Sequence, residues 1–199
     1  YPRSGSLLDK ESSGPAGSAP DTFTHQPPLQ FPTNCSEIPG LFYETPVLEE
    51  DVEVTGNVAV YLQAALSASD GVFSINLIDV APNGSETTVS SGYLRASHRP
   101  AQKDITREWY PTHDHSKQVP VEPGKIYEYG IEVLPISRVF QKGHKIKITI
   151  KNSSPNNYTS LTILPAAERI RYDIFVNEEH PSYLLLPIIP YTPEENWID

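Results

Sequence analysis

The sequence is poor in cysteine, methionine, basic residues and long apolar runs. One cysteine in 199 residues excludes an internal disulfide and a zinc site built from cysteines. No stretch reaches the ~20 consecutive apolar residues of a membrane-spanning helix, so we expect no membrane partner. The chain lacks methionine and starts at a tyrosine, and we therefore expect a fragment of a longer protein. Fifteen Lys and Arg stand against 25 Asp and Glu, a net charge of −10. Such a surface repels phosphate backbones, which makes nucleic acid an unexpected partner.

The remaining composition predicts one folded domain. Hydrophobic residues make up 38% and charged residues 20%, which is too apolar for wholesale disorder. A chain of 199 residues is long enough to bury a sizeable core. The 20 prolines disfavour a helical bundle, because proline interrupts helices.

Hydrophobic and polar residues alternate along several segments, as they do in half-buried strands. The clearest case is residues 145–151, where Ile146, Ile148 and Ile150 alternate with Lys and Thr. Further strands are expected at residues 57–65, 72–80, 87–96, 126–133 and 169–176. Residues 183–189 are nearly all apolar, which predicts a central strand covered on both sides. About eight strands separated by Pro and Gly turns predict an all-β fold, a sandwich or jelly roll.

The first 40 residues differ in composition from the rest. Residues 12–20 consist almost entirely of Ser, Gly, Pro and Ala, which is typical of loops and linkers. Phe23, Leu29 and Phe31 interrupt this composition and predict an irregular segment lying along a surface. We therefore expect an irregular lead-in or linker at residues 1–40 and a β-domain at residues 41–199.

The sequence contains no nucleophile motif of the α/β-hydrolase type. That motif is Gly-x-Ser-x-Gly, on a sharp turn between a strand and a helix. The nearest stretch, GPAGS at residues 14–18, has the wrong spacing and lacks both flanking elements. We therefore expect no catalytic residue in this chain.

Histidines and carboxylates form two candidate metal sites. In WYPTHDH at residues 109–115, His113 and His115 would face the same side of a strand, as some metal sites require. The sequence nominates no further ligands, so we favour a polar loop that packs Trp109 on the sandwich. Three adjacent acidic residues at 49–51 cannot converge on one calcium ion, which favours a solvated turn. We expect no metal and no cofactor.

Carbohydrate and anion binding stay open at the level of residues. Six aromatic residues would form a stacking platform if they shared one face, although aromatic residues in strands more often belong to the core. They are Tyr61, Tyr93, Trp109, Tyr127, Tyr129 and Trp197. Arg95 and Arg99, beside His98, would either bind an anion or hold the carboxylates of a neighbouring domain.

Seven blocks of sequence carry a resemblance to a known family. They are FYETPVL at 42–48, DVEVTG at 51–56, LIDVAPNG at 77–84, GYLRASHR at 92–99, VEPGKIY at 121–127, PISRVFQKGHKI at 135–146 and HPSYLLLPIIP at 180–190. In this order they resemble the C-terminal domain of Xaa-Pro dipeptidyl-peptidase-like hydrolases, the CocE/NonD group.

The resemblance implies a jelly-roll sandwich of the galactose-binding-like kind. In the family this domain packs on an α/β-hydrolase domain that holds the Ser-His-Asp triad. The C-terminal domain supports the fold and helps to wall the substrate cleft. The resemblance thus implies a non-catalytic accessory domain whose partner is the catalytic domain of the same chain. Residues 109–115 resemble the uncharacterised hydrolase branch, so an ester or amide acyl hydrolase is expected rather than a proline-specific peptidase.

The candidates for an interdomain or cleft site are Arg95, His98, Arg99, Trp109, His113 and His115. The alternative function is a self-standing carbohydrate-binding jelly-roll module. A missing partner would leave an apolar face, for which we expect self-association as a homo-oligomer. That face would include Phe23, Leu29, Phe31, Leu41 and Tyr110. We expect a cytoplasmic rather than a secreted protein.

Overall fold

Strands form nearly all regular structure in residues 3–6, 15–25, 39–152 and 169–190, the residues that this computed structural model describes. The strands are β1 (Arg3–Ser6), β2 (Asp21–His25), β3 (Gly40–Glu44), β4 (Val52–Leu66), β5 (Val72–Val80), β6 (Glu86–Arg95), β7 (Tyr127–Phe140), β8 (Lys145–Lys151), β9 (Ile170–Phe175), β10 (Tyr183–Leu186) and β11 (Ile188–Ile189). One short 3-10 helix, η2 (Ala96–His98), follows β6. The predicted all-β class is confirmed. Within the described ranges, no helix is long and apolar enough to cross a membrane.

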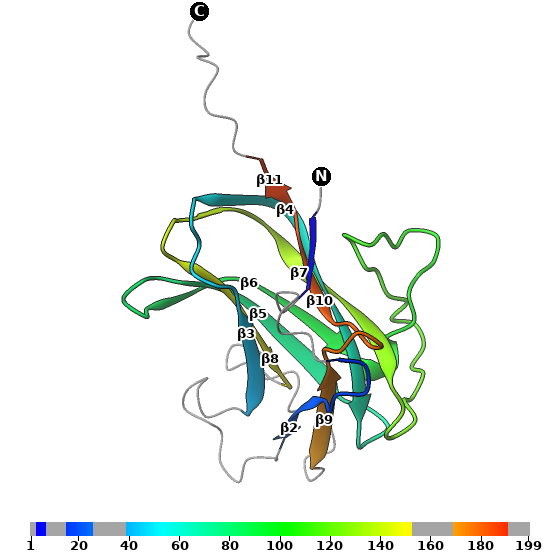
Figure 1. The fold of residues 1–199 in the computed structure, drawn as a ribbon. Helices are drawn as coiled ribbons and strands as arrows, with labels where there is room; N and C mark the ends of the chain where they lie inside the picture. The colour runs from blue at the N-terminus through cyan, green and yellow to red at the C-terminus, as the bar shows by residue number, and fades with distance from the viewer. Residues whose placement is uncertain (1–2, 7–14, 26–38, 153–168, 191–199) are drawn as a thin grey trace, which may run out of the picture.

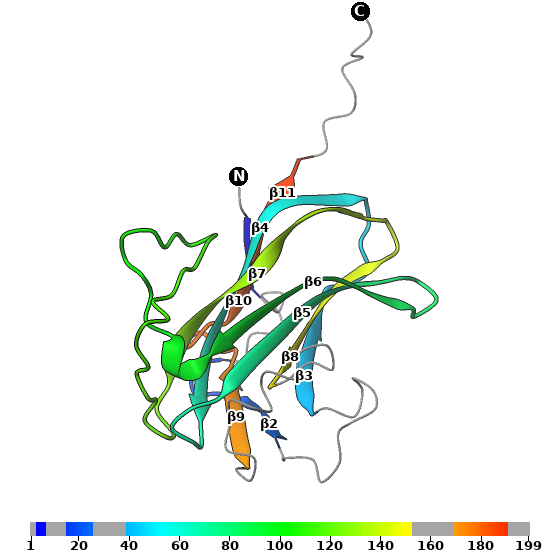
Figure 2. The same ribbon diagram turned by 180° about the vertical axis from the view of Figure 1, so that it is seen from behind.

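The strands form one bent, antiparallel sheet that folds back on itself as a sandwich (Figure 1). Its order is β1-β10-β4-β7-β6-β5-β8-β3, while β9 and β11 pair with β4, and β2 pairs with β9. The first layer contains β4, β7 and their neighbours. The second contains β6, β5, β8 and β3 (Figure 2). Residues that alternate inward from both layers make the core between them.

The two layers join where β6 crosses β7. The ladder between these strands has a single pair, Gly92 with Val133. A Cβ atom on Gly92 would lie 2.1 Å from the carbonyl oxygen of Glu132. Because the two backbones touch at this point, only glycine fits the crossing.

The opposite side of the sandwich is closed by side chains. Tyr43 of β3 donates a hydrogen bond from its hydroxyl to Oδ2 of Asp21 in β2, at 2.8 Å. Burial, and then the carboxylate of Asp21, raise the pKa of the Tyr43 hydroxyl, so it keeps its proton at neutral pH. The sheet is therefore nearly closed into a barrel.

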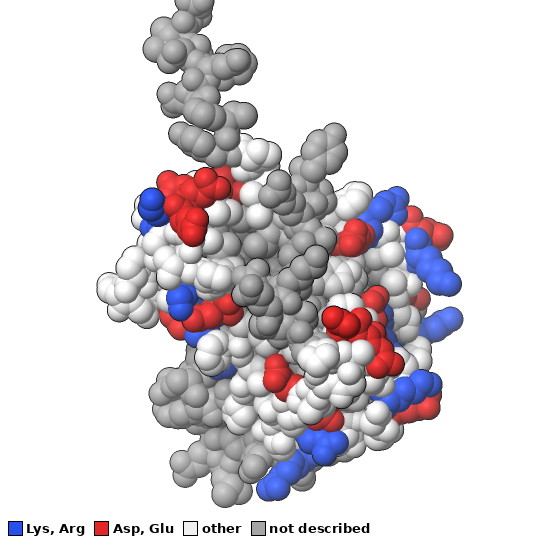
Figure 3. Space-filling view, viewed as in Figure 1, with Lys and Arg blue, Asp and Glu red and all other residues white. Residues whose placement is uncertain are grey.

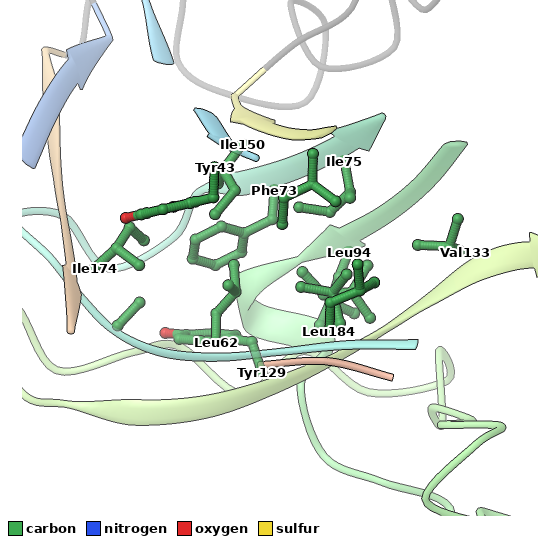
Figure 4. Packing of buried hydrophobic residues seen from close by; sticks show 14 of the residues in the cluster. Tyr43, Leu62, Phe73, Ile75, Leu94, Tyr129, Val133, Ile150, Ile174 and Leu184 are labelled. Carbon is green, nitrogen blue, oxygen red and sulfur yellow. The ribbon is translucent and has the colours of Figure 1, made fainter. Parts of the chain in front are cut away.

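Aromatic rings from both layers meet in the core (Figure 4). The ring centroid of Phe73 on β5 lies 4.6 Å from that of Tyr129 on β7 and 5.5 Å from that of Tyr172 on β9. Phe23 of β2 stacks on Tyr172 at 4.6 Å. Phe23 was expected on an exposed face. It is instead 6% exposed, because β2 pairs with β9 and turns this ring inward.

The segment expected to be irregular contains two strands. β1 pairs with β10, and β2 pairs with β9, through backbone hydrogen bonds that such short segments do not reveal in the sequence. Leu29 and Phe31 lie outside the described residues. Leu41 is partly buried and packs against the core. The apolar strand predicted at 183–189 is central as β10, and it is interrupted at Pro187, after which β11 begins.

One buried carboxylate links β5 to the turn before β8. Asp79 is 4% exposed, and its oxygens lie 2.7 Å from Nη2 of Arg138 and 2.7 Å from Nδ1 of His144. Burial alone would raise the pKa of Asp79, but the hydrogen bonds from Arg138 and His144 outweigh burial and lower it. The charge is thus held by the ends of β7 and β8.

The crossing at Gly92 gives a prediction about stability. We expect Gly92→Ala to lower the free energy of unfolding by about 3 kcal/mol or more, because the new methyl group would collide with backbone. The measurement is urea denaturation followed by circular dichroism. Gly124→Ala is the matched control: its φ is +80° with nothing within 4 Å of the added Cβ. It should cost only about 1–2 kcal/mol. Equal losses in both variants would contradict a packing role for Gly92.

Candidate interdomain site

All six candidate residues lie in or beside the connection between β6 and β7. Arg95 ends β6, and the other five belong to residues 96–126, called here the β6–β7 loop. In Figure 1 this loop stands beside β7, away from the β5–β8 layer. Three sets of contacts decide what each candidate is free to do.

The first set of contacts is at Asp70, in the turn before β5. Nε of Arg95 lies 2.6 Å from Oδ2 of Asp70. The backbone N–H of Ser97 donates to the same carboxylate at 2.9 Å, and its hydroxyl donates at 3.0 Å. The charge of Arg95 is therefore already paired, and its role is to fix the start of the loop.

The second set of contacts is at Arg99. Its guanidinium donates to the backbone carbonyls of Ala96, Val119 and Pro120. It also lies over the ring of Tyr127, with 4.2 Å between the guanidinium carbon and the ring centroid. Arg99 thus joins both ends of the loop, which argues against a role in binding a free anion.

The third set of contacts is at His113, which ties the loop to β7. Its Nδ1 lies 3.1 Å from the carbonyl oxygen of Arg99, and its Nε2 lies 2.7 Å from that of Gly130. Gly130 makes the close approach possible, since a Cβ there would lie 2.9 Å from the ring of Tyr61 and 3.1 Å from Pro111. His113, rather than Trp109, packs the loop on the sandwich.

Trp109 lies at the apex of a tight turn. Arg107 and Tyr110 exchange backbone hydrogen bonds of 3.0 and 2.9 Å, which leaves Glu108 and Trp109 at the turn. The hydroxyl of Tyr61 donates to the carbonyl oxygen of Glu108 at 2.8 Å. Burial, and then nearby carboxylates, raise the pKa of Tyr61 to about 12, so this donor keeps its proton at neutral pH. The apex is therefore held in place by its backbone.

The apex exposes large apolar side chains. Trp109 and Ile105 are each 48% exposed, and Tyr110 is 38% exposed. We expected Trp109 to pack on the sandwich. About half of the side chain is exposed instead. Trp and Tyr are over-represented among residues that dominate protein interfaces. A rigid loop with exposed aromatic side chains has the properties of a contact surface.

His98 and His115 face each other rather than a metal. Their Nδ1 atoms lie 2.9 Å apart, and the rings of His113 and His115 are 6.2 Å apart. Within the described part of the chain, no group of three or more His, Cys, Asp or Glu side chains is placed to hold a metal ion. The acidic residues at 49–51 are exposed, and Oδ1 of Asp51 accepts the backbone N–H of Lys142 at 2.7 Å.

The described residues form a hollow on each of two faces, one beside the β6–β7 loop and one over the second layer. One, of about 240 Å³, separates the β6–β7 loop from β4 and β7 and contains Tyr61, Glu108 and Glu128. The other, of about 540 Å³, lies over β3, β8 and β5. Its Lys147 is paired with Glu86 at 2.7 Å and lies 4.4 Å from the ring centroid of Phe42. Positive and negative side chains alternate over the face in Figure 3, without a wide area of one sign.

The aromatic residues considered for a sugar platform lie in different surroundings. Tyr129 is fully buried, Tyr127 lies under Arg99, and Tyr61 stacks on Tyr183 with 4.9 Å between centroids. Tyr93 on β6 is 41% exposed and Trp109 is on the loop, while Trp197 is outside the described residues. The described aromatic residues therefore form no common stacking face.

A match to a protein-family model shows which family the chain belongs to. The model of the X-Pro dipeptidyl-peptidase C-terminal non-catalytic domain matches residues 2–171. The chain belongs to this family. The resemblance inferred from the seven sequence blocks is thereby confirmed, and the family is described as non-catalytic.

Similar proteins are hydrolases several times longer than this chain. A protein named as a serine esterase in Mycobacterium bovis is 33% identical over 156 residues, which cover 75% of this chain and 24% of that protein. Cocaine esterase of a Rhodococcus species is 32% identical over 158 residues, covering 75% and 25%. The fold is similar to a CocE/NonD family hydrolase structure from Staphylococcus aureus, with a TM-score of 0.71 and 17% identity over 95% of this chain and 37% of that one. The chain thus spans about a quarter of the length of the curated relatives it matches.

Three structural partners of the candidates were missed in the sequence. Asp70, Tyr61 and Gly130 fix the loop from outside it, at separations of 25 to 47 residues for the first two and 17 for the third. Asp70 precedes Gly71 at the end of a strand pattern, which indicates a turn but not its distant partner. Sequence spacing alone gives no information on such contacts.

Two substitutions test which side chain holds the loop on the sandwich and which is merely exposed at its apex. We expect His113→Ala to lower the free energy of unfolding by about 1–3 kcal/mol, because the loop loses the ring that lies between Arg99 and Gly130 and its hydrogen bond to one of their carbonyl groups. Trp109→Ala should change it by less than about 0.5 kcal/mol, since the side chain is half exposed. Thermal and urea unfolding of both variants measure this. A larger loss in Trp109→Ala than in His113→Ala would contradict the assignment.

Proposed function

We propose that the chain is the C-terminal accessory domain of a serine acyl hydrolase and that it supports a catalytic domain in the same polypeptide. The proposal is supported by membership of a non-catalytic domain family and by longer relatives named as esterases. The absent Gly-x-Ser-x-Gly motif agrees with it. The reaction we infer for the whole protein is hydrolysis of an ester or amide through an acyl-enzyme.

The β6–β7 loop is the part that we assign to the catalytic domain and its cleft. The observation that carries this assignment is a half-exposed Trp109 at the apex of a turn whose backbone is fixed by Tyr61 and by Arg107–Tyr110 bonds. A rigid aromatic side chain loses little conformational freedom on binding. In this proposal Trp109 contacts the partner, whereas Arg95, Arg99 and His113 hold the loop in position.

The carbohydrate-binding alternative is not taken further. It was suggested by aromatic residues on strands, and those described here are buried, stacked on one another or on separate elements. In the larger hollow, Lys147 is already paired with Glu86 and covers the ring of Phe42. These contacts do not favour a stacking platform for a sugar ring.

The proposal predicts that the isolated chain has no hydrolase activity. The 199-residue chain should hydrolyse p-nitrophenyl esters and Xaa-Pro-anilides no faster than buffer does. The reason is the absence of a nucleophile motif, without which an acyl-enzyme cannot form. The measurement is release of p-nitrophenol or nitroaniline, with trypsin as a positive control for ester cleavage. Turnover that a serine-directed reagent abolishes would overturn the non-catalytic assignment.

The second prediction concerns docking. In a chain that includes the preceding catalytic domain, amide hydrogen exchange at residues 104–111 should slow by about tenfold relative to the isolated chain, because the partner covers the apex. The Trp109→Ala variant of the longer chain should lose most of that protection. Tyr93→Ala is the control, as Tyr93 is an equally exposed aromatic residue outside the loop. Unchanged exchange at the apex in the longer chain would refute docking through this loop.

A further inference from the structure

Besides the contacts of Arg99 and His113, two backbone hydrogen bonds and one pair of rings connect the two segments at the base of the β6–β7 loop. The backbone N–H of Val119 donates to the carbonyl oxygen of Ser97 at 2.7 Å, and that of Asp114 donates to Pro100 at 3.4 Å. Between these two bonds the ring of His98 meets the ring of His115, with 5.2 Å between centroids. The histidine pair, His98 and His115, therefore lies between two backbone hydrogen bonds that join antiparallel segments.

The distance within the histidine pair fixes its proton content. Nδ1 of His98 and Nδ1 of His115 are 2.9 Å apart, which is a hydrogen-bond distance. One of these atoms must carry a hydrogen and the other a lone pair. If both carried hydrogens, two N–H groups would point at each other. The contact thus exists only while at least one ring is neutral.

Burial selects which ring donates. Nε2 of His98 is buried and has no hydrogen-bond partner among the described residues. A buried N–H without an acceptor is costly, so the hydrogen of neutral His98 belongs on Nδ1. His115, which is exposed, then accepts with its own Nδ1 and carries its hydrogen on Nε2. The bond is lost when both rings are charged, because neither Nδ1 then keeps a lone pair.

We propose that the histidine pair is an acid-sensitive latch on the β6–β7 loop, closed at neutral pH and opened when both rings are charged. It is a property of this chain alone and does not depend on docking to a catalytic domain. Opening would loosen the segment between His113 and Val119, whose two ends stay bound through His113 and Arg99, while the apex at Trp109 keeps its own contacts with Tyr61.

The charges around the latch oppose a second proton. Arg95 faces His98 from β6, His113 and His115 face it from the loop, and Asp70 alone is negative. Asp114 and Lys117 are the charged neighbours of His115 along the loop. Asp70 is already bonded to Arg95, and Asp114 accepts the backbone N–H of Ser116. Neither carboxylate is therefore free to stabilise two charged rings.

Protonation of His98 at low pH disfavours the folded state. Burial first, then the charges of His115 and Arg95, lower the pKa of His98 from 6.5. The unfolded chain binds this proton more readily than the folded one. The folded, latched state is consequently favoured above pH 6.5 and loses that advantage as the pH falls from 6.5 toward the lowered value.

Local hydrogen exchange tests the latch. Burial also lowers the pKa of His25, so overall stability depends on pH for a second reason and is not a clean measurement. We expect the protection factors of the Asp114 and Val119 amides in the wild-type chain to fall about tenfold between about pH 7.5 and pH 5, after correction for intrinsic exchange. In His115→Gln, which keeps an acceptor but does not titrate, they should change by less than about twofold.

A control and a second measurement make the test decisive. His180→Gln removes a histidine outside the loop and should leave the wild-type response intact. Long-range ¹⁵N spectra at neutral pH should place the hydrogen of His98 on Nδ1. The latch is refuted if His115→Gln responds to acid as the wild type does, or if His98 carries its hydrogen on Nε2. Protection that Zn²⁺ increases at neutral pH in the wild type alone would refute it too, by identifying the pair as a metal site.

Discussion

The contact between the backbones of β6 and β7 at Gly92 determines how the rest of the sandwich is arranged. At the pair of Gly92 with Val133 the backbones of the two layers lie in direct contact, with no room for a side chain on Gly92. The ends of the β6–β7 loop leave from strands whose relative position is set by that crossing. The geometry of the loop is therefore a consequence of the fold, and the same applies to the side chains that the loop presents.

In the β6–β7 loop, polar side chains are bonded within the domain, whereas aromatic side chains are exposed to solvent. Arg95 and Arg99 could be anion-binding residues on sequence grounds. In the structure Arg95 donates to Asp70, and Arg99 donates to backbone carbonyls. His113 is similarly occupied between two carbonyl groups. The polar candidates thus form the framework, and the aromatic residues at the apex are left for recognition. In the proposed accessory role, this exposed surface is the part of the domain that would contact the catalytic domain.

The strands could be predicted from the sequence because burial follows the period of two. Ile146, Ile148 and Ile150 alternate inward on β8 as expected, whereas the apolar run at 183–189 is divided between β10, which pairs with β1 and β4, and β11, where Ile189 is exposed. The pairing of β1 with β10 and of β2 with β9 could not be predicted, since backbone hydrogen bonds at a sheet edge need no particular side chains. Nor could the exposure of Trp109, because a packed and a displayed tryptophan have the same sequence context. The candidate residues were close in sequence and share one loop, but their roles depend on Asp70, Tyr61 and Gly130, which are distant.

The turn at Arg107–Tyr110 also bears on how this domain could diverge. Its shape depends on backbone groups and on the hydroxyl of Tyr61, none of which belongs to the side chains of Glu108 and Trp109. Mutations at these two apex positions therefore meet little selection for folding. A lineage of such proteins could change what the apex contacts, one residue at a time, while every intermediate keeps an intact sandwich.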